Sequence, residues 1–173
     1  APTQEIKRHL MKEGTRAEDI LVTGIPVRQQ FLDADCRQKR ERNRTRRVLI
    51  MGGGLGLMPD LKELLEKLHS MQGVESVVIT GKNHKMYEEW VNRYEDVEVL
   101  GYTENISRYM RGADLVITKA GGITLFEILH SQVPLFVIHP FLEQEMNNAR
   151  YAAEKGFAKV IWGRREDYIP ELE

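Results

Sequence analysis

Two glycine-containing segments could bind phosphate, because each follows a short apolar run that is typical of a buried strand. Residues 52–56 have the sequence Gly-Gly-Gly-Leu-Gly and follow the apolar residues 48–51. Glycine lets the backbone approach a diphosphate closely, and a following helix offers unpaired N–H groups and the positive end of its dipole. This segment therefore indicates a phosphate-binding turn. The alternative is a tight strand-to-helix turn that needs no ligand.

The spacing of these glycines does not match the common nucleotide-binding motifs. A G-x-G-x-x-G fingerprint starting at Gly52 ends on Leu57, and one starting at Gly54 ends on Pro59. Gly81-Lys82 lacks the earlier glycine and the following Ser or Thr of a Walker loop. The sequence therefore disfavours a dinucleotide-dependent oxidoreductase.

The second segment, residues 119–127, carries more polar groups. Gly121 and Gly122 would expose backbone donors, Lys119 is a cation and Thr124 offers a hydroxyl. Glu127 lies one turn into the expected helix, where a carboxylate can accept hydrogen bonds from both hydroxyls of a ribose. The alternative is a capping box, since Thr124-x-x-Glu127 has that spacing and needs no ligand. Two glycine turns at one edge of a sheet favour the ligand.

A third candidate opens the helix that follows residues 135–138. Gln144 and Glu145 place an amide and a carboxylate side by side, and both can hydrogen-bond adjacent sugar hydroxyls. Spacing alone favours a solvated helix start, where acidic side chains interact well with the dipole.

Other groups give weaker signals. Asp33-Ala34-Asp35 has the D-x-D form that can hold a metal with a nucleotide diphosphate, but it lies in a polar loop with no strand before it. The histidines show no ligand spacing, and the single cysteine, Cys36, excludes an internal disulfide and a cysteine-based zinc site. The basic run at residues 37–47 could contact anionic lipid headgroups or RNA phosphates, although a solvated linker is the favoured interpretation.

Composition is consistent with a soluble domain in a reducing, cytoplasmic setting. The chain has 173 residues, 42% of them hydrophobic and 29% charged, and a formal net charge of −1. This balance argues against a uniformly basic nucleic-acid-binding protein. The first residue is an alanine rather than a start methionine, and we expect the chain to be part of a longer polypeptide.

Alternating strands and helices are predicted to position these groups. Short apolar strands alternate with amphipathic helices, which predicts a parallel sheet covered on both faces, a doubly wound α/β domain over residues 46–165. Ligands bind beyond the carboxyl ends of the strands in such sheets. The predicted strands are 20–22, 48–51, 77–79, 97–100, 115–118, 135–138 and 158–161, and the predicted helices are 4–13, one opening near Pro59, 86–94, 106–110, 123–130 and 143–154.

Taken in order, these motifs resemble the family-28 glycosyltransferases, most of all the diacylglycerol glucosyltransferases and monogalactosyldiacylglycerol synthases. The resemblance covers most of the chain. It rests on the segments 22–27, 52–56, 118–127 and 144–148, the last of which includes Gln144, Glu145 and Asn148.

The resemblance implies one half of a GT-B fold, in which two Rossmann-like domains face each other across a cleft. Residues 1–35 would be the end of the N-terminal domain and the crossover, residues 36–47 a basic linker, and residues 48–173 the C-terminal nucleotide-sugar-binding domain. The family's general base and most of its acceptor-lipid surface belong to the N-terminal domain, so no catalytic residue is expected in this chain.

The resemblance also implies a role for each matching residue. Gly53 and Gly54 would lie near the diphosphate, and Gly101 with Tyr102 near the uracil. The sugar hydroxyls would be bound by Gln144, Glu145 and Asn148. Phosphates would contact Lys119, Gly121, Gly122 and Thr124, and the ribose would be held by Glu127.

These roles predict the UDP-sugar-binding domain of an inverting hexosyltransferase that acts on a lipid acceptor such as diacylglycerol. The donor is UDP-glucose or UDP-galactose, with no obligatory metal or cofactor. The full-length enzyme would be cytoplasmic and peripheral on the inner membrane face, and this chain alone would turn over negligibly. Two alternatives remain: a donor-binding subunit that needs a membrane-anchored partner, and a UDP-sugar 2-epimerase of the same fold.

Overall fold

The computed structural model describes residues 1–32, 45–53, 56, 58 and 60–163. Asp33, Asp35, Cys36, Gly54, Pro59 and most of the basic run lie outside the described residues.

Six parallel strands form one sheet in the order β3-β2-β1-β4-β5-β6. The register sets Met51 of β1 beside Ile79 on one side and Thr118 on the other, so the carboxyl ends of these central strands are level. The chain leaves β1 toward β2 and later returns to β1's other side as β4, which makes the gap between β1 and β4 the topological switch point. The strands are β1 (Arg46–Met51), β2 (Val74–Ile79), β3 (Val97–Leu100), β4 (Leu115–Thr118), β5 (Leu135–Ile138) and β6 (Lys159–Ile161).

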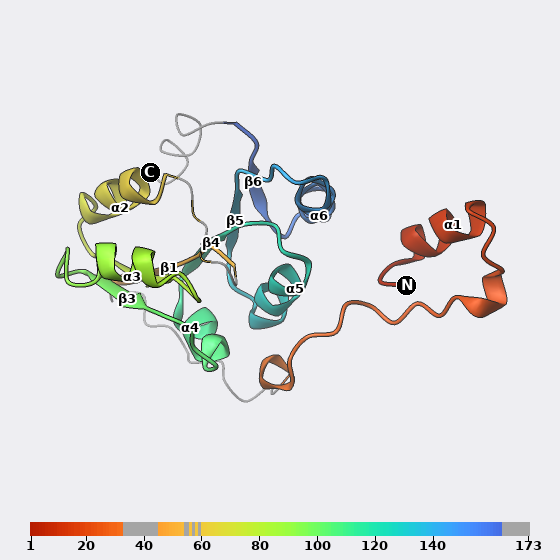
Figure 1. Cartoon of the computed structure of the whole chain (residues 1–173), viewed down its shortest axis with the longest axis horizontal. Helices are drawn as coiled ribbons and strands as arrows, with labels where there is room; N and C mark the ends of the chain where they lie inside the picture. Colours follow the sequence, from red (N-terminus) through yellow and green to blue (C-terminus); the bar gives the residue numbers. More distant parts are fainter. Residues whose placement is uncertain (33–44, 54–55, 57, 59, 164–173) are drawn as a thin grey trace.

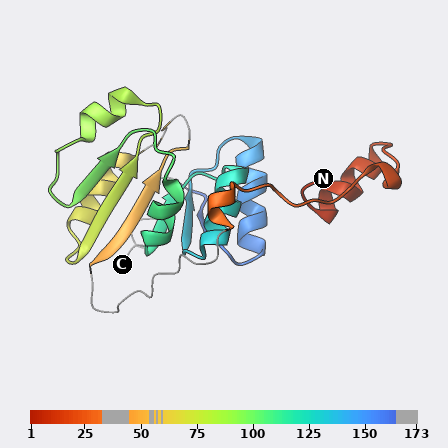
Figure 2. The same cartoon turned by 90° about the horizontal axis from the view of Figure 1, so that it is seen from below.

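Helices cover both faces of this sheet, which confirms the predicted doubly wound α/β class (Figures 1 and 2). Strand side chains alternate between the two layers: Leu49 and Met51 pack in one hydrophobic cluster, Val48 and Ile50 in the other. The first layer is completed by α4 (Ile106–Gly112), α5 (Gly122–Ser131) and α6 (Glu143–Glu154), the second by α2 (Leu61–His69) and α3 (His84–Trp90).

The first 23 residues form a small unit that stands apart from the sheet (Figures 1 and 2). Its helix α1 (Gln4–Lys12) begins after Thr3, whose hydroxyl accepts a hydrogen bond from the Ile6 N–H. The chain folds back on this helix, and the Ala1 amino group donates to the Leu21 carbonyl at 2.6 Å. A short 3-10 turn, η1 (Ala17–Asp19), lies within the fold-back.

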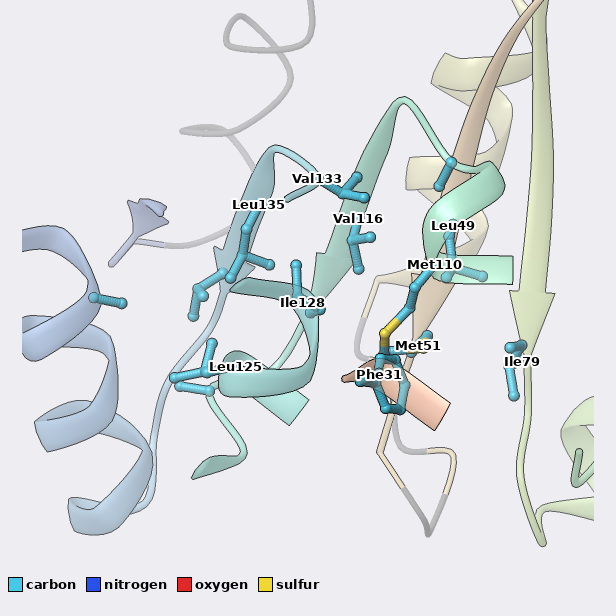
Figure 3. Packing of buried hydrophobic residues seen from close by; sticks show 14 of the residues in the cluster. Phe31, Leu49, Met51, Ile79, Met110, Val116, Leu125, Ile128, Val133 and Leu135 are labelled. Carbon is cyan, nitrogen blue, oxygen red and sulfur yellow. The ribbon is translucent and has the colours of Figure 1, made fainter. Parts of the chain in front are cut away.

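The next segment, around the 3-10 turn η2 (Gln29–Phe31), packs against the sheet domain instead. Phe31 is 4% exposed and belongs to the same hydrophobic cluster as Met51 and Met110 (Figure 3). Arg111 donates to the Gln30 carbonyl at 2.8 Å, and Gln30 donates to the Glu104 carbonyl at 3.1 Å. Residues 28–31 are therefore fixed on the domain, while the predicted domain boundaries at residues 35 and 47 stay predictions.

The bounds of β1, β2, β6, α1, α4 and α5 differ from the predicted ones by one to three residues, and three further elements differ in kind or position. Residues 20–22 are extended but form no strand, since their hydrogen bonds go to α1 and the amino terminus. Helix α2 begins at Leu61 rather than near Pro59, after Asp60 in the left-handed conformation. Helix α3 begins at His84 and ends at Trp90 rather than spanning 86–94, because Asn83 caps its start and Val91 turns extended.

Candidate nucleotide-sugar site

Two turns meet at the switch point of the sheet. One follows β1 and the other follows β4, and these strands are neighbours whose last residues, Met51 and Thr118, are paired. Both turns leave the carboxyl edge at the same level, at the position where doubly wound folds bind ligands.

The first turn needs its glycines to fold. Gly53 and Gly56 both have positive φ, 71° and 60°, and the Gly56 N–H donates to the Gly53 carbonyl at 3.0 Å. A Cβ on Gly56 would lie 2.8 Å from the Thr80 carbonyl carbon and would strike the carbonyl oxygen of the same residue. Gly53 is exposed, with nothing within 4 Å of a Cβ placed there. The tight-turn interpretation thus accounts for Gly56, and phosphate binding at Gly53 stays a prediction.

A hollow of about 390 Å³ lies beside this first turn, between α2 and α3. Its wall includes Gly56 and Asn83, and its residues come from the α2–α3 side of the sheet rather than from the second turn. It therefore lies to one side of the switch point rather than between the two turns. The charged side chains that line it are Asp60, Lys62, Glu63, Lys85 and Glu89.

The second turn does not need its glycines for steric reasons. Gly121 has an ordinary extended conformation, φ −67° and ψ 127°, and a Cβ there would meet only Thr124 at 3.6 Å. At Gly122 a Cβ would meet only the Asn148 amide, also at 3.6 Å. These are ordinary van der Waals distances, so both positions have room for a side chain. Helix α5 starts here with no side-chain cap, so its first N–H groups point at the open turn.

Asn148 of α6 holds this second turn in place. Its Nδ2 donates to the Ala120 carbonyl at 2.9 Å, and Ala120 is fully buried. The adjacent Lys119 places its Nζ 4.8 Å from the centre of the Phe141 ring. The second turn therefore has a fixed backbone and a cation beside it.

Glu127 is buried one turn into α5 and carries an ion pair with an arginine from the start of the chain. The Arg28 Nε donates to Oε1 at 2.7 Å and Nη2 donates to Oε2 at 3.0 Å. The capping-box interpretation is wrong, because Gly121 is the N-cap and Thr124 is already the third residue of the helix. The carboxylate is thus committed to a polar contact at the site rather than to the start of its own helix.

Arg28 is the site residue that the sequence did not reveal. It lies 99 residues from its partner, and the segment 22–27 that directly precedes it gave no role to residue 28. The pKa of its guanidinium is raised, mainly by the hydrogen bond to Glu127. Burial lowers this pKa in part, and the charges of Glu127 and Tyr102 raise it further. Tyr102 itself is 67% exposed, and Gly101 before it is half-buried at the end of β3.

The predicted sugar-binding residues open helix α6 at the same edge. Gln144 is exposed, and Glu145 is half-buried with its Oε2 accepting a hydrogen bond from the Phe141 N–H at 3.4 Å. Asn148 lies one turn further along and contacts the second turn. Strand β5 and the switch-point strand β4 are neighbours, so the start of α6 flanks the second turn.

Residues 47–167 match the model of the glycosyltransferase family 28 C-terminal domain. That segment contains both turns, Glu127 and the start of α6. The chain belongs to this family.

Relatives of known name agree with the family assignment. The chain is 35% identical over 183 residues to a processive diacylglycerol beta-glucosyltransferase of Bacillus licheniformis, covering 98% of this chain and 46% of the relative. It therefore spans about half the length of the curated relatives that it matches.

Solved structures show the same fold. A UDP-GlcNAc 2-epimerase from Neisseria meningitidis bound to UDP-GlcNAc has a TM-score of 0.67 at 16% identity, covering 99% of this chain and 50% of that chain. Spinosyn rhamnosyltransferase SpnG complexed with thymidine diphosphate has a TM-score of 0.60 at 19% identity, covering 76% and 37%. The chain is thus a family-28 C-terminal domain with the Rossmann-like architecture of a GT-B half.

Two of the histidines lie beside carboxylates. The His139 Nε2 lies 3.5 Å from Asp60 Oδ2, and both residues have positive φ, which links the end of β5 to the start of α2. The His69 Nδ1 lies 2.7 Å from Asp96 Oδ1. Within the described ranges, no three His, Cys, Asp or Glu side chains are grouped as metal ligands would be, and no helix has the length and apolarity to cross a membrane.

Proposed function

We propose that this domain binds the UDP-hexose donor of a glycosyltransferase whose acceptor is a lipid hydroxyl such as that of diacylglycerol. The observation that carries the proposal is the meeting of two glycine turns, a lysine and a buried carboxylate at the switch point of the sheet. The name of the Bacillus relative supports a glucose donor and a diacylglycerol acceptor, although UDP-galactose fits the same chemistry.

Each part of the donor has a group of matching chemistry. The diphosphate would lie at the open start of α5 with Lys119 beside it, where backbone N–H groups and a cation offset its charge. The ribose diol would bind the Glu127 carboxylate, and Tyr102 would flank the uracil. Gln144 and Glu145 would orient the hexose through its hydroxyls, with Asn148 keeping the second turn in place beneath them.

For the reaction, we propose inverting transfer with UDP as the leaving group. The N–H groups at the second turn and Lys119 would stabilise the charge that develops on the departing diphosphate. No metal is required for this stabilisation. The general base and most of the acceptor surface would come from another domain, and the longer protein would act in the cytoplasm, peripherally on the inner membrane face.

Calorimetry on the 173-residue chain tests donor binding. We expect UDP to bind and 2′,3′-dideoxy-UDP to bind at least tenfold more weakly, because a charge-assisted hydrogen bond contributes roughly 1.5–3 kcal/mol. Changing the ligand leaves the protein intact, so folding cannot confuse the result. Equal affinity for the two ligands would remove Glu127 from the ribose site, and no binding of either by folded protein would refute the proposal.

Product analysis tests whether this domain carries out transfer or epimerisation by itself. The chain is incubated with labelled UDP-glucose and vesicles that contain diacylglycerol. We expect neither glycolipid nor a new UDP-hexose, because the proposed base is absent from this domain. Glycolipid formation would show that the domain is catalytically complete, whereas an epimerised UDP-hexose would establish the alternative function.

A further inference from the structure

Both carboxylate oxygens of Glu127 already accept hydrogen bonds in this structure. The carboxylate is 2% exposed, and Arg28 covers it by donating one hydrogen bond to each of its oxygens. A ribose diol also donates one hydrogen bond to each oxygen. Arg28 therefore makes the pair of contacts that the ribose needs, and the ribose cannot reach a carboxylate so enclosed unless the arginine moves.

Arg28 is placed so that it can move without unfolding the segment that carries it. Its side chain is 46% exposed, whereas Phe31, three residues on, is buried in the hydrophobic cluster. Gln30 is held separately, through the Glu104 carbonyl and through Arg111. Rotation of the arginine side chain into solvent leaves these attachments intact.

We propose that Arg28 occupies the ribose position of the unliganded domain and that donor binding displaces it from Glu127. This inference rests on the proposed function, since it assumes that Glu127 binds the ribose. The ion pair keeps a buried carboxylate neutralised while the site is empty, which would otherwise be a costly uncompensated charge. A ligand that supplies both hydroxyls replaces the two hydrogen bonds that the arginine gives up, although not its charge.

The displacement also links the donor site to the start of the chain. Donor binding frees Arg28, and by reciprocity any contact that draws Arg28 away strengthens donor binding by the same factor. Arg28 lies near the start of the chain and its side chain is 46% exposed, so a contact made by that side chain and the occupancy of the donor site are coupled.

The test compares UDP with 2′,3′-dideoxy-UDP on the parent chain and on R28Q. The measured quantity is the dissociation constant of 2′,3′-dideoxy-UDP divided by that of UDP. This ratio reports the ribose contact alone, because any effect of the arginine charge on the diphosphate is common to both ligands. We expect the ratio to rise at least fivefold in R28Q, since the diol no longer competes. R28K keeps the positive charge but not the two parallel N–H donors of the guanidinium. It should give a ratio between those of the parent and R28Q.

R16Q is the matched control. Arg16 makes the same forked contact, with Asp19 at 2.9 and 3.1 Å, but on the exposed N-terminal unit. Its ratio should equal that of the parent. Thermal unfolding of each variant establishes that the protein measured is folded. If R28Q does not fold, R28K takes its place in the comparison.

The outcomes separate the two proposals. A ratio near one in both the parent and R28Q means that Glu127 does not bind the ribose, and the proposed function fails with the inference. A clear parent ratio that falls in R28Q shows that Arg28 supports the bound ribose instead of competing with it, and a ratio that is unchanged shows that the two are independent. Either of these results overturns the displacement and leaves the proposed function standing.

Discussion

The two glycine turns at the switch point resemble each other in sequence and differ in what their glycines do. In the first turn, Gly56 has a positive φ and no room for a Cβ against Thr80. In the second, Gly121 and Gly122 have ordinary conformations and room for a side chain. Folding explains the glycine in the first turn and leaves those of the second unexplained.

This difference shows where ligand binding is best sought. A glycine that the backbone requires carries no information about a ligand, since any protein with that turn needs it. A glycine that the fold could replace by alanine indicates that something else must approach the backbone closely. By this criterion the second turn, next to Lys119 and Glu127, is the stronger candidate for the diphosphate.

The largest expected effect is on stability at the first turn. G56A should lower the free energy of unfolding by about 3 kcal/mol, because overpacking against Thr80 adds to the strain of a left-handed alanine. G73A is the control, since Gly73 has φ 72° but open space around a Cβ; it should lose only about 1 kcal/mol. Urea unfolding measures the free energy of unfolding of both variants. Equal losses in G56A and G73A would show that the contact with Thr80 adds nothing to the cost of the positive φ.

At the second turn the expected effect is on binding. G121A should keep the free energy of unfolding within about 0.5 kcal/mol of the parent, as its conformation suits alanine. Its methyl group would still hinder approach to the start of α5, so UDP affinity should fall about tenfold, or about 1.4 kcal/mol. G112A, at the end of α4 with open space around its Cβ, should bind UDP like the parent. Unchanged affinity of G121A in calorimetry would contradict a ligand at this turn.

A smaller effect is expected when the cation beside the second turn is removed. K119Q should weaken UDP binding about fivefold at low salt, and less at high salt, because screening reduces the contribution of an accessible charge. K62Q is the control, since Lys62 pairs with Glu66 on the surface of α2. Calorimetry at two salt concentrations would contradict the role of Lys119 if K119Q and the parent lost affinity in parallel.

The smallest effect should follow loss of the contact that holds the second turn. N148A removes the hydrogen bond to the Ala120 carbonyl, which should cost about 1 kcal/mol of stability. UDP affinity should fall about twofold to threefold, as the turn becomes less ordered. N147A is the control, because Asn147 contacts only Arg150 among the interactions described for it, on the surface. If both variants behaved alike in unfolding and titration, Asn148 would have no special part in positioning the turn.

Much of the domain could be predicted from local sequence. Strands β3, β4 and β5 and helix α6 have the predicted bounds, because short apolar runs and helical periodicity are local properties. Helix α3 was misplaced at both ends, since its Asn83 cap and the extended turn at Val91 depend on single residues within an unbroken amphipathic pattern. Residues 20–22 look like a strand locally, but no strand among the described residues pairs with them.

The sequence by itself determined the alternation of strands and helices, and with it the edge of the sheet at which Lys119, Glu127 and Gln144 must lie. Only the tertiary structure decided which glycine is required, because the obstacle at Gly56 is the backbone of Thr80, which follows the neighbouring strand β2. It also decided the partner of Glu127. Periodicity and motif spacing report on near neighbours along the chain, whereas an ion pair across 99 residues exists only once the fold has brought its two ends together.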